Sequence, residues 1–217
     1  KEQVHDIFNI KYEKISMVPL GASNRPISKV KIKNSSNLNI LFFGRIWEYK
    51  GLKYLIKAEP LIRRKFKKFK IIIAGEGENF NQYMEMIKNQ DSFIIKNYRV
   101  SEYEMAELFM NSSIVVLPYT EATQTGIVPF AFQYGKAVVA SDVGSISDVV
   151  DNNVNGFLVP PRDVEALANS ILKLLLDGKK RLVFSQNARK KYETYLSPTN
   201  SVYQTLKTYK KSLYNNK

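Results

Sequence analysis

Short, continuous apolar segments recur along this chain and are separated by longer stretches of mixed character. The apolar segments are rich in Ile, Val, Phe and Leu and do not alternate with polar residues. They are Asn39–Phe43, Lys70–Ala74, Ser92–Ile95, Ile114–Leu117, Ala137–Ala140 and Gly156–Val159. Continuous runs of this length predict strands that are buried on both faces, as in a parallel sheet.

The stretches between these strands have helical periodicity, and each is long enough to cross from one parallel strand to the next. They are Leu52–Phe66, Phe80–Asn89, Glu102–Met110, Gly126–Tyr134 and Asp163–Leu176. The alternation of strand and helix predicts an α/β fold with a doubly wound parallel sheet. In the last part of the chain, Asp163 can cap the first helix, Asp177-Gly178 ends it, and amphipathic helix then continues without a second core.

Composition narrows the function classes. A chain of 217 residues with 44% hydrophobic residues suits one globular domain, and its apolar runs are shorter than the roughly 18 residues of a membrane-spanning helix. No cysteine is present, which excludes disulfides and cysteine-based zinc sites and is compatible with a reducing, cytoplasmic location. His5 is the only histidine, so we expect a surface or packing role for it and predict neither a catalytic triad nor a metal site.

A formal net charge of +13 points to anionic partners, namely phosphate, anionic lipid or nucleic acid. Lys and Arg cluster between Lys50 and Lys70 and again near the C-terminus. In the predicted helix Leu52–Phe66, apolar positions such as Leu55 and Ile62 leave the cations on the outer side. Two interpretations of this basic face stay open: a solvated helix surface, or contact with an anionic membrane surface, such as the inner face of the cell membrane.

In an open parallel sheet, ligands bind beyond the carboxyl ends of the strands. The first such loop, Gly44–Gly51, carries two permanent cations: Arg45 offers a planar fork for phosphate oxygens and Lys50 a point charge. The alternative is that both are ordinary loop charges and that Gly51 only eases a turn. The second loop contains Gly75 and Gly77, where absent Cβ atoms would let a ligand approach the backbone, although the full G-x-G-x-x-G pattern is missing.

The third loop, Pro118–Gly126, lies between a strand and a predicted helix, so its amides should point outward at the positive helix end and suit an anion. Thr123 or Thr125 as a helix N-cap would explain the hydroxyls of this loop equally well. Glu121 is not explained by capping, because a carboxylate beside an anion site must face polar groups of its own.

Taken together, these loops resemble the donor-binding C-terminal domain of the retaining, nucleotide-sugar-dependent glycosyltransferases with the two-domain GT-B fold. The resemblance extends from about Lys14 to Leu176. The segments that carry it are Gly44-Arg45-x-x-x-x-Lys50-Gly51, Ile73–Gly77, Gly135–Gly144 and Asn155-Gly156-Phe157-Leu158-Val159-Pro160-Pro161-x-Asp163.

The resemblance implies a Rossmann-like sheet that forms a single half of a GT-B fold. By it, residues 1–23 are the end of the first domain and the linker, 24–195 the nucleotide-sugar-binding domain, and 196–217 a C-terminal helix. The family's first domain, which carries the acceptor site for a sugar or lipid-linked acceptor, is absent from this chain. We therefore expect this fragment alone to lack transferase activity.

The resemblance also implies roles for individual residues. Arg45 and Lys50 would bind the diphosphate of a UDP- or GDP-type sugar donor, and with Glu121 they form the implied catalytic set; no cofactor or metal is expected. The residues implied in donor binding are Gly44, Gly75, Gly77, Tyr98, Val100, Thr123, Gln124, Thr125 and Gly126. Among them, Tyr98 and Val100 would lie near the base.

One departure concerns the family's two glutamates spaced eight residues apart, the second of which is expected to hold the ribose hydroxyls. Glu121 fits the first, whereas Pro129 and Phe130 occupy the place of the second. The loop resembles a subgroup with the pattern Glu-Ala-Thr/Ser-Gln-Ser/Thr-Gly. We interpret the departure as an altered ribose contact with donor binding retained.

The function that follows is retaining transfer of a sugar from a nucleoside-diphosphate sugar to an acceptor, in polysaccharide or lipopolysaccharide biosynthesis. An NAD-dependent oxidoreductase shares the fold class, but no complete G-x-G-x-x-G with a suitably spaced ribose-binding acid is present. A nucleic-acid or anionic-surface binding module would use the basic clusters, including Arg189 and Lys211. We expect no nucleic-acid partner.

Overall fold

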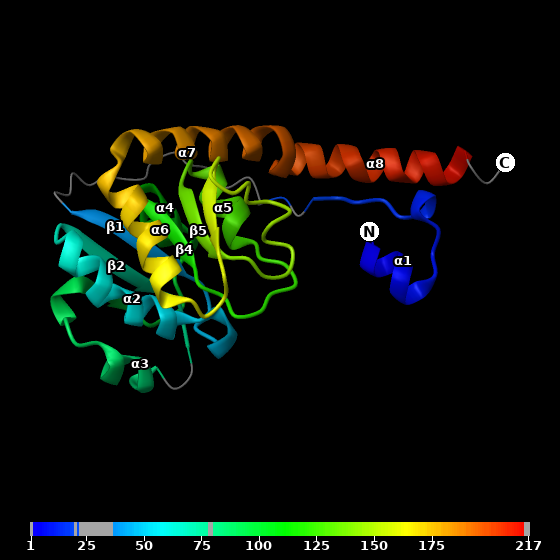
Figure 1. The fold of residues 1–217 in the computed structure, drawn as a ribbon. Coiled ribbons are helices and arrows are strands. Elements are labelled where there is room, and N and C mark those ends of the chain that lie inside the picture. The colour runs from blue at the N-terminus through cyan, green and yellow to red at the C-terminus, as the bar shows by residue number, and fades with distance from the viewer. Residues whose placement is uncertain (1, 20, 22–36, 78–79, 215–217) are drawn as a thin grey trace.

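The computed structural model describes residues 2–19, 21, 37–77 and 80–214, and its centre is a six-stranded sheet (Figure 1). The strand order is β3-β2-β1-β4-β5-β6, and every neighbouring pair is parallel. The strands are β1 (Leu38–Phe43), β2 (Phe69–Ala74), β3 (Phe93–Lys96), β4 (Ile114–Leu117), β5 (Ala137–Ser141) and β6 (Gly156–Val159). The predicted doubly wound parallel sheet is confirmed, and each strand begins and ends within one residue of its predicted bounds.

Helices cover both faces of the sheet. One face packs against α2 (Leu52–Lys65), α3 (Asn81–Met86) and α6 (Val164–Leu176), and the other against α4 (Glu102–Met110) and α5 (Ile127–Gln133). Short 3-10 turns, η2 (Glu48–Lys50) and η3 (Gln90–Ser92), precede α2 and β3.

Alternation along each strand explains the two cores. In β1, Ile40 and Phe42 face the α2 and α6 side, whereas Leu41 between them faces the α4 and α5 side. All three are at most 1% exposed, so both faces of the strand are apolar and the sequence shows a continuous run. Each such side chain contributes roughly 1.5–3 kcal/mol by leaving water.

Two aspartates cap the first two helices after β6. Asp163 accepts a hydrogen bond from the Ala166 N–H at 2.8 Å and starts α6, as predicted. Asp177 ends α6 and also accepts from the Lys180 N–H at 2.9 Å, which starts α7 (Gly178–Lys191). Helix α7 then connects the two cores, because its Phe184 belongs to one and Ala188 to the other.

Beyond α7, a π-helical turn, η4 (Tyr192–Leu196), leads into α8 (Pro198–Tyr214), which extends away from the sheet (Figure 1). The N-terminal segment, with α1 (Glu2–Phe8) and η1 (Tyr12–Lys14), lies on the same side. Ser201 Oγ donates to the Pro19 carbonyl at 3.0 Å, and Lys211 Nζ donates to the Glu13 carbonyl at 2.9 Å. The proposed domain boundary at residues 23 and 24 lies outside the described residues.

One buried carboxylate fixes the edge of the sheet to a helix. Glu59 of α2 is 1% exposed and accepts hydrogen bonds from Ser92 Oγ at 2.5 Å and Asn89 Nδ2 at 2.9 Å. Arg63, one turn later, donates to the same Ser92 hydroxyl at 2.9 Å. These bonds hold the turn before β3 against α2.

Across the described ranges, no helix is long and apolar enough to cross a membrane.

Candidate functional site

The order of the strands places the candidate site. From β1 the chain winds outward through β2 to β3, and from β4 it winds the opposite way through β5 to β6. The direction reverses between neighbouring β1 and β4, and ligands of doubly wound sheets bind in the crevice at such a reversal, beyond the carboxyl ends of the strands. The two loops that border this crevice are Gly44–Gly51 after β1 and Pro118–Gly126 after β4.

These two loops are joined directly. The Thr120 N–H donates to the Tyr49 carbonyl at 2.7 Å, and the Thr120 hydroxyl donates to the same oxygen at 3.2 Å. The Tyr49 ring meets the Tyr119 ring edge-on, with centroids 6.0 Å apart. The residues predicted on two separate loops are therefore parts of one surface.

Lys50 is the most unusual residue of this surface. It is only 8% exposed, and within the described ranges no carboxylate forms an ion pair with its ammonium group. Burial, with the nearby Arg45 charge as a second cause, lowers the pKa of Lys50 from 10.5 to about 8. A buried, unpaired cation is costly, and a ligand anion would remove that cost.

The surroundings of Lys50 offer little compensation. Its Nζ lies 5.6 Å from the centre of the Tyr119 ring, a cation–π contact worth roughly 0.5–2 kcal/mol. Burial also raises the pKa of Tyr119, so its phenol stays neutral. Arg45 is exposed, and its guanidinium lies 5.2 Å from the Trp47 ring centre. The two cations predicted to bind phosphate thus differ: one is exposed, the other buried.

The glycines of these loops serve the packing of the protein itself. A Cβ atom on Gly75 would lie 2.2 Å from the Gly44 carbonyl oxygen, and one on Gly77 would lie 2.5 Å from Ile46 Cβ. At Gly75 the φ of +142° also excludes most other residues. The side of Gly75 and of Gly77 where a Cβ atom would stand is therefore filled by the neighbouring loop after β1, and a ligand contact with their backbone stays a prediction.

The loop after β4 is held from the other side. Ser145 Oγ donates to the Thr123 carbonyl at 2.6 Å, and a Cβ atom on Gly144 would lie 1.7 Å from the Ala122 carbonyl oxygen. The helix α5 has Gly126 at its N-cap position, so neither threonine is the N-cap residue. Thr125 still uses its hydroxyl locally, because it accepts from the Ile127 N–H at 3.2 Å.

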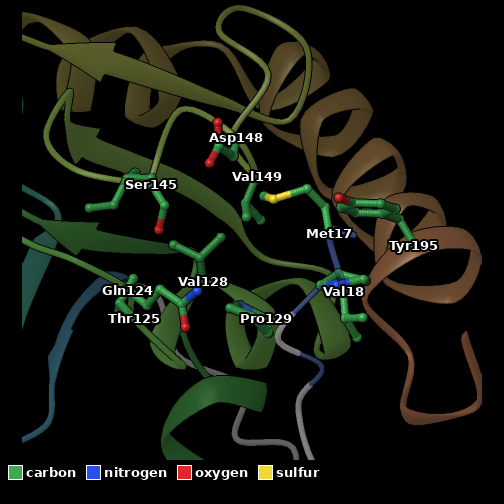
Figure 2. Close-up of a pocket in the computed structure, with 12 residues that line it drawn as sticks. Met17, Val18, Gln124, Thr125, Val128, Pro129, Ser145, Asp148, Val149 and Tyr195 are labelled. Atoms are coloured by element: carbon green, nitrogen blue, oxygen red, sulfur yellow. The ribbon is translucent and has the colours of Figure 1, made fainter. Parts of the chain in front are cut away.

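Residues of this loop line two separate hollows. The apolar hollow, about 70 Å³, is drawn in Figure 2. It is lined by Met17, Val18, Pro19, Gln124, Thr125, Val128, Pro129, Ser145, Ile146, Asp148, Val149 and Tyr195. The polar hollow, about 340 Å³, is lined by Glu48, Tyr49, Lys53, Tyr54, Thr120, Glu121 and Arg162.

The predicted site residues divide between these places. Gln124 and Thr125 line the apolar hollow, together with Pro129 at the position of the expected second glutamate, whereas Glu121 lines the polar hollow.

Tyr98 and Val100 line neither hollow. Tyr98 follows β3, which is separated from β1 by β2 and so stands about 10 Å from it. Its hydroxyl donates to Glu104 Oε1 at 2.7 Å, and Lys96 Nζ donates to the same carboxylate oxygen at 2.7 Å. Val100 packs against the core on the α4 and α5 side. Their role near a base stays a prediction.

Two further sequence features have structural roles. Asn155 is 1% exposed and exchanges hydrogen bonds with Asp151, whose carboxylate also pairs with Lys191 at 2.7 Å. His5 lies in α1, where its Nδ1 is 2.8 Å from the Ile10 carbonyl oxygen. In the part of the chain that the structure describes, no group of three or more potential metal ligands comes together.

Sequence reasoning missed several residues that shape the site. Tyr119 supports Lys50, Ser145 holds the loop after β4, and Arg162 reaches the polar hollow from the loop after β6. Only Arg162 lies inside a segment that carries the family resemblance. It is the residue written as x in Pro160-Pro161-x-Asp163.

A doubly wound parallel sheet whose loops meet at the reversal point places the chain in the class of α/β domains that bind ligands at the carboxyl ends of their strands. Within that class, the sequence profile of the glycosyl transferases group 1 family matches residues 23–191. The chain belongs to this family.

Curated relatives agree with this assignment. The chain is 29% identical to an uncharacterised glycosyltransferase of Methanocaldococcus jannaschii, over 97% of this chain and 57% of that protein. It is 27% identical to a capsular polysaccharide biosynthesis glycosyltransferase of Staphylococcus aureus, over 86% of this chain and 53% of that protein. The chain thus spans about half the length of the curated relatives it matches.

Solved structures show the same fold. The C-terminal domain of a group 1 glycosyl transferase from Francisella tularensis superposes with a TM-score of 0.68 at 22% identity, over 83% of this chain and 97% of that one. The Anabaena protein HepE, solved with UDP, gives a TM-score of 0.73 at 22% identity, over 81% of this chain and 49% of that one. The chain is one half of a GT-B fold.

Proposed function

We propose that this chain is the nucleotide-sugar-binding part of a retaining glycosyltransferase, and that the crevice between the loops after β1 and β4 holds the donor diphosphate. The observation that carries the proposal is Lys50, a buried cation with no carboxylate partner in the described residues. It stands at the reversal point of the sheet, where ligands of this fold class bind.

The proposed chemistry is electrostatic. When the bond between sugar and diphosphate breaks, negative charge develops on the departing nucleoside diphosphate. Lys50 lies in a place of low polarity, where its charge acts more strongly than in water, and Arg45 adds a planar donor from the exposed side. No metal ion is needed for this stabilisation.

The identity of the donor rests on the relatives. HepE has been solved with UDP and with UDP-glucose, which favours a UDP-sugar over a GDP-sugar for this chain. The Staphylococcus aureus relative acts in capsular polysaccharide biosynthesis, which favours a polysaccharide or lipid-linked acceptor. Transfer with retention and the acceptor itself belong to the complete enzyme.

Calorimetric titration with UDP, UMP, GDP and GMP tests the proposal. We expect a diphosphate to bind at least tenfold more tightly than its monophosphate, about 1.4 kcal/mol, because Lys50 and Arg45 act on the second phosphate. Lys50→Ala should abolish this difference. The matched control is Lys57→Ala, which removes an exposed cation of α2, the helix that follows Lys50, and should leave the difference intact. Equal affinities for mono- and diphosphates in the unmodified chain would refute the assignment.

A second proposal concerns the basic face of α2. Two of its cations have partners within the protein: Lys53 pairs with Glu48 at 2.9 Å, and Arg63 donates to Ser92. The exposed cations lie between the middle of α2 and the start of β2. They are therefore near the amino ends of the strands, whereas the crevice is at the carboxyl ends. They are Lys57, Arg64, Lys65, Lys67 and Lys68. We propose that this cluster, the basic edge, contacts an anionic membrane surface, at about 1 kcal/mol per cation near the surface.

A further inference from the structure

The polar hollow has the size of a sugar-binding pocket and opens beside the proposed diphosphate site. Its volume of about 340 Å³ lies within the range of small-molecule sites. Tyr49 forms part of its wall and is the residue directly before Lys50, while Thr120 joins the two loops across it. A group bound in the hollow would therefore be within reach of a diphosphate held by Lys50.

Arg162 is the unexpected residue of this hollow. It has a φ of +66°, in the left-handed region where residues other than glycine are strained. The next residue, Asp163, is fixed as the cap of α6, so the backbone here is set by the helix start. Glycine would adopt this conformation without strain, so a side chain at position 162 has to be explained by what it contacts.

The contacts of the Arg162 side chain suggest a role in ligand recognition and not in stabilising the fold. Arg162 is exposed, and none of the described residues forms an ion pair or hydrogen bond with its guanidinium. It lines the hollow together with groups that could share a ligand with it, above all the carboxylate of Glu121. Five N–H donors of a guanidinium and two acceptor oxygens of a carboxylate together suit neighbouring hydroxyl groups.

The charges of the hollow select the class of ligand. Lys53 and Glu48 neutralise one another at 2.9 Å, which leaves Arg162 and Glu121, one charge of each sign. The balanced charge disfavours an anionic ligand, whereas the mixture of donors, acceptors and the Tyr49 and Tyr54 side chains suits an uncharged polyol ring.

We propose that the polar hollow binds an uncharged sugar ring, and that Arg162 is a residue that determines its specificity. The proposal rests on the proposed function, since it takes the neighbouring crevice as the diphosphate site. The ring is the sugar of the donor or the terminal sugar of the acceptor, and these two sources are distinguishable by experiment.

The test uses Arg162→Gly, because glycine suits the φ of +66° and the fold should survive. Thermal unfolding should confirm a Tm within about 4 °C of the unmodified chain, a change of about one kcal/mol or less. Titration with UDP, UDP-glucose, UDP-galactose and UDP-glucuronic acid, and saturation-transfer NMR with free glucose on the UDP-saturated chain, provide the readouts. Lys57→Ala is again the matched control, since Lys57 does not line the hollow.

If the donor sugar occupies the hollow, a neutral UDP-hexose binds more tightly than UDP, and Arg162→Gly removes at least fivefold of that advantage while the affinity for UDP stays within twofold. If the acceptor sugar occupies it, the UDP-hexose advantage is unchanged, but the free-glucose signal is lost in Arg162→Gly. Arg162→Lys should restore part of whichever signal was lost.

Unchanged binding of both ligands in Arg162→Gly, or tighter binding of UDP-glucuronic acid than of the neutral UDP-hexoses, would overturn the inference. Failure of UDP itself to bind would instead refute the proposed function, while free glucose could still report on the hollow.

Discussion

Replacing Lys50 by methionine should make the chain more stable and at the same time unable to hold a diphosphate. Methionine has nearly the same length and fills the same buried space without a charge. Burial, and secondly the Arg45 charge, lower the pKa of Lys50 from 10.5 to about 8, which corresponds to about 3 kcal/mol of destabilisation of its charged form. Loss of the cation–π contact with Tyr119 offsets part of this gain. We expect a net gain of about 1–3 kcal/mol near pH 7, or roughly 2–10 °C in Tm for a domain of this size.

The pH dependence gives the sign of the effect. Below pH 8, Lys50 is protonated in both the folded and the unfolded chain, so the full cost of burial is present. Between pH 8 and 10.5 the folded chain loses this proton first, and above 10.5 both states are neutral. The stability difference between Lys50→Met and the unmodified chain should therefore be largest below pH 8 and disappear as the pH rises toward 10.5.

A second buried lysine serves as the control. Burial also lowers the pKa of Lys136 to about 8, but its Nζ donates to the Met110 carbonyl at the end of α4, at 2.8 Å. Lys136→Met would leave that carbonyl without this donor and should destabilise the chain, in contrast to Lys50→Met.

Urea unfolding of both variants at pH 7 and pH 10, with and without UDP, decides the matter. UDP should stabilise the unmodified chain by RT ln(1 + [UDP]/Kd), and it should stabilise Lys50→Met much less at the same concentration. If Lys50→Met is less stable than the unmodified chain at pH 7, the Lys50 cation is already satisfied within the protein, and our account of the crevice fails.

Further expectations follow from the same contacts. UDP affinity should fall by up to about tenfold per pH unit above pH 8, because free Lys50 loses its proton there; calorimetry in two buffers of different ionisation enthalpy should detect proton uptake on binding, and its absence would contradict a role for Lys50. In the complete enzyme, Glu121→Gln should lower turnover while diphosphate affinity stays within about tenfold, roughly 1.4 kcal/mol; normal turnover with lost diphosphate binding would make Glu121 a support of the loop. Glu59→Ala should cost about 2–4 kcal/mol in urea unfolding by leaving the donors on Ser92 and Asn89 unpaired, and Glu59→Gln less; equal stability of Glu59→Ala and the parent chain would show that water replaces the carboxylate. Reversing the charges of the basic edge should abolish sedimentation with anionic liposomes at low salt and leave UDP binding unchanged, whereas equal sedimentation with neutral liposomes would exclude an electrostatic membrane contact.

The strands could be predicted because burial on both faces requires an apolar residue at nearly every position of the strand itself. A strand such as β4, covered on both faces, must be apolar at every position, and Ile114–Leu117 shows this without knowledge of its neighbours. The start of α6 was equally predictable, since the Asp163 side chain bonds a backbone N–H three residues later. The start of α5 was also predicted within one residue, at Gly126, although Gly126 has no capping side chain and the hydroxyl of Thr125 accepts from the Ile127 N–H instead.

The site was only partly predictable, because its decisive properties arise from contacts between distant segments. The sequence marks Arg45 and Lys50 as two cations of one loop, but only the approach of the loop after β4 buries the second of them. The polar hollow likewise exists because Arg162, far along the chain, comes to lie beside the start of α2. No local pattern carries that information.

The loops at the carboxyl ends of the strands pack tightly against one another. Gly75 contacts the Gly44 carbonyl, and Gly144 contacts the Ala122 carbonyl. A backbone shift in one loop would have to displace its neighbour, so the crevice should be ready-made before any ligand arrives, and little ordering entropy should be lost on binding. For protein engineering, this means that a new donor preference would come from exchanging side chains at the loop tips, since altering loop length would disturb several strand ends at once.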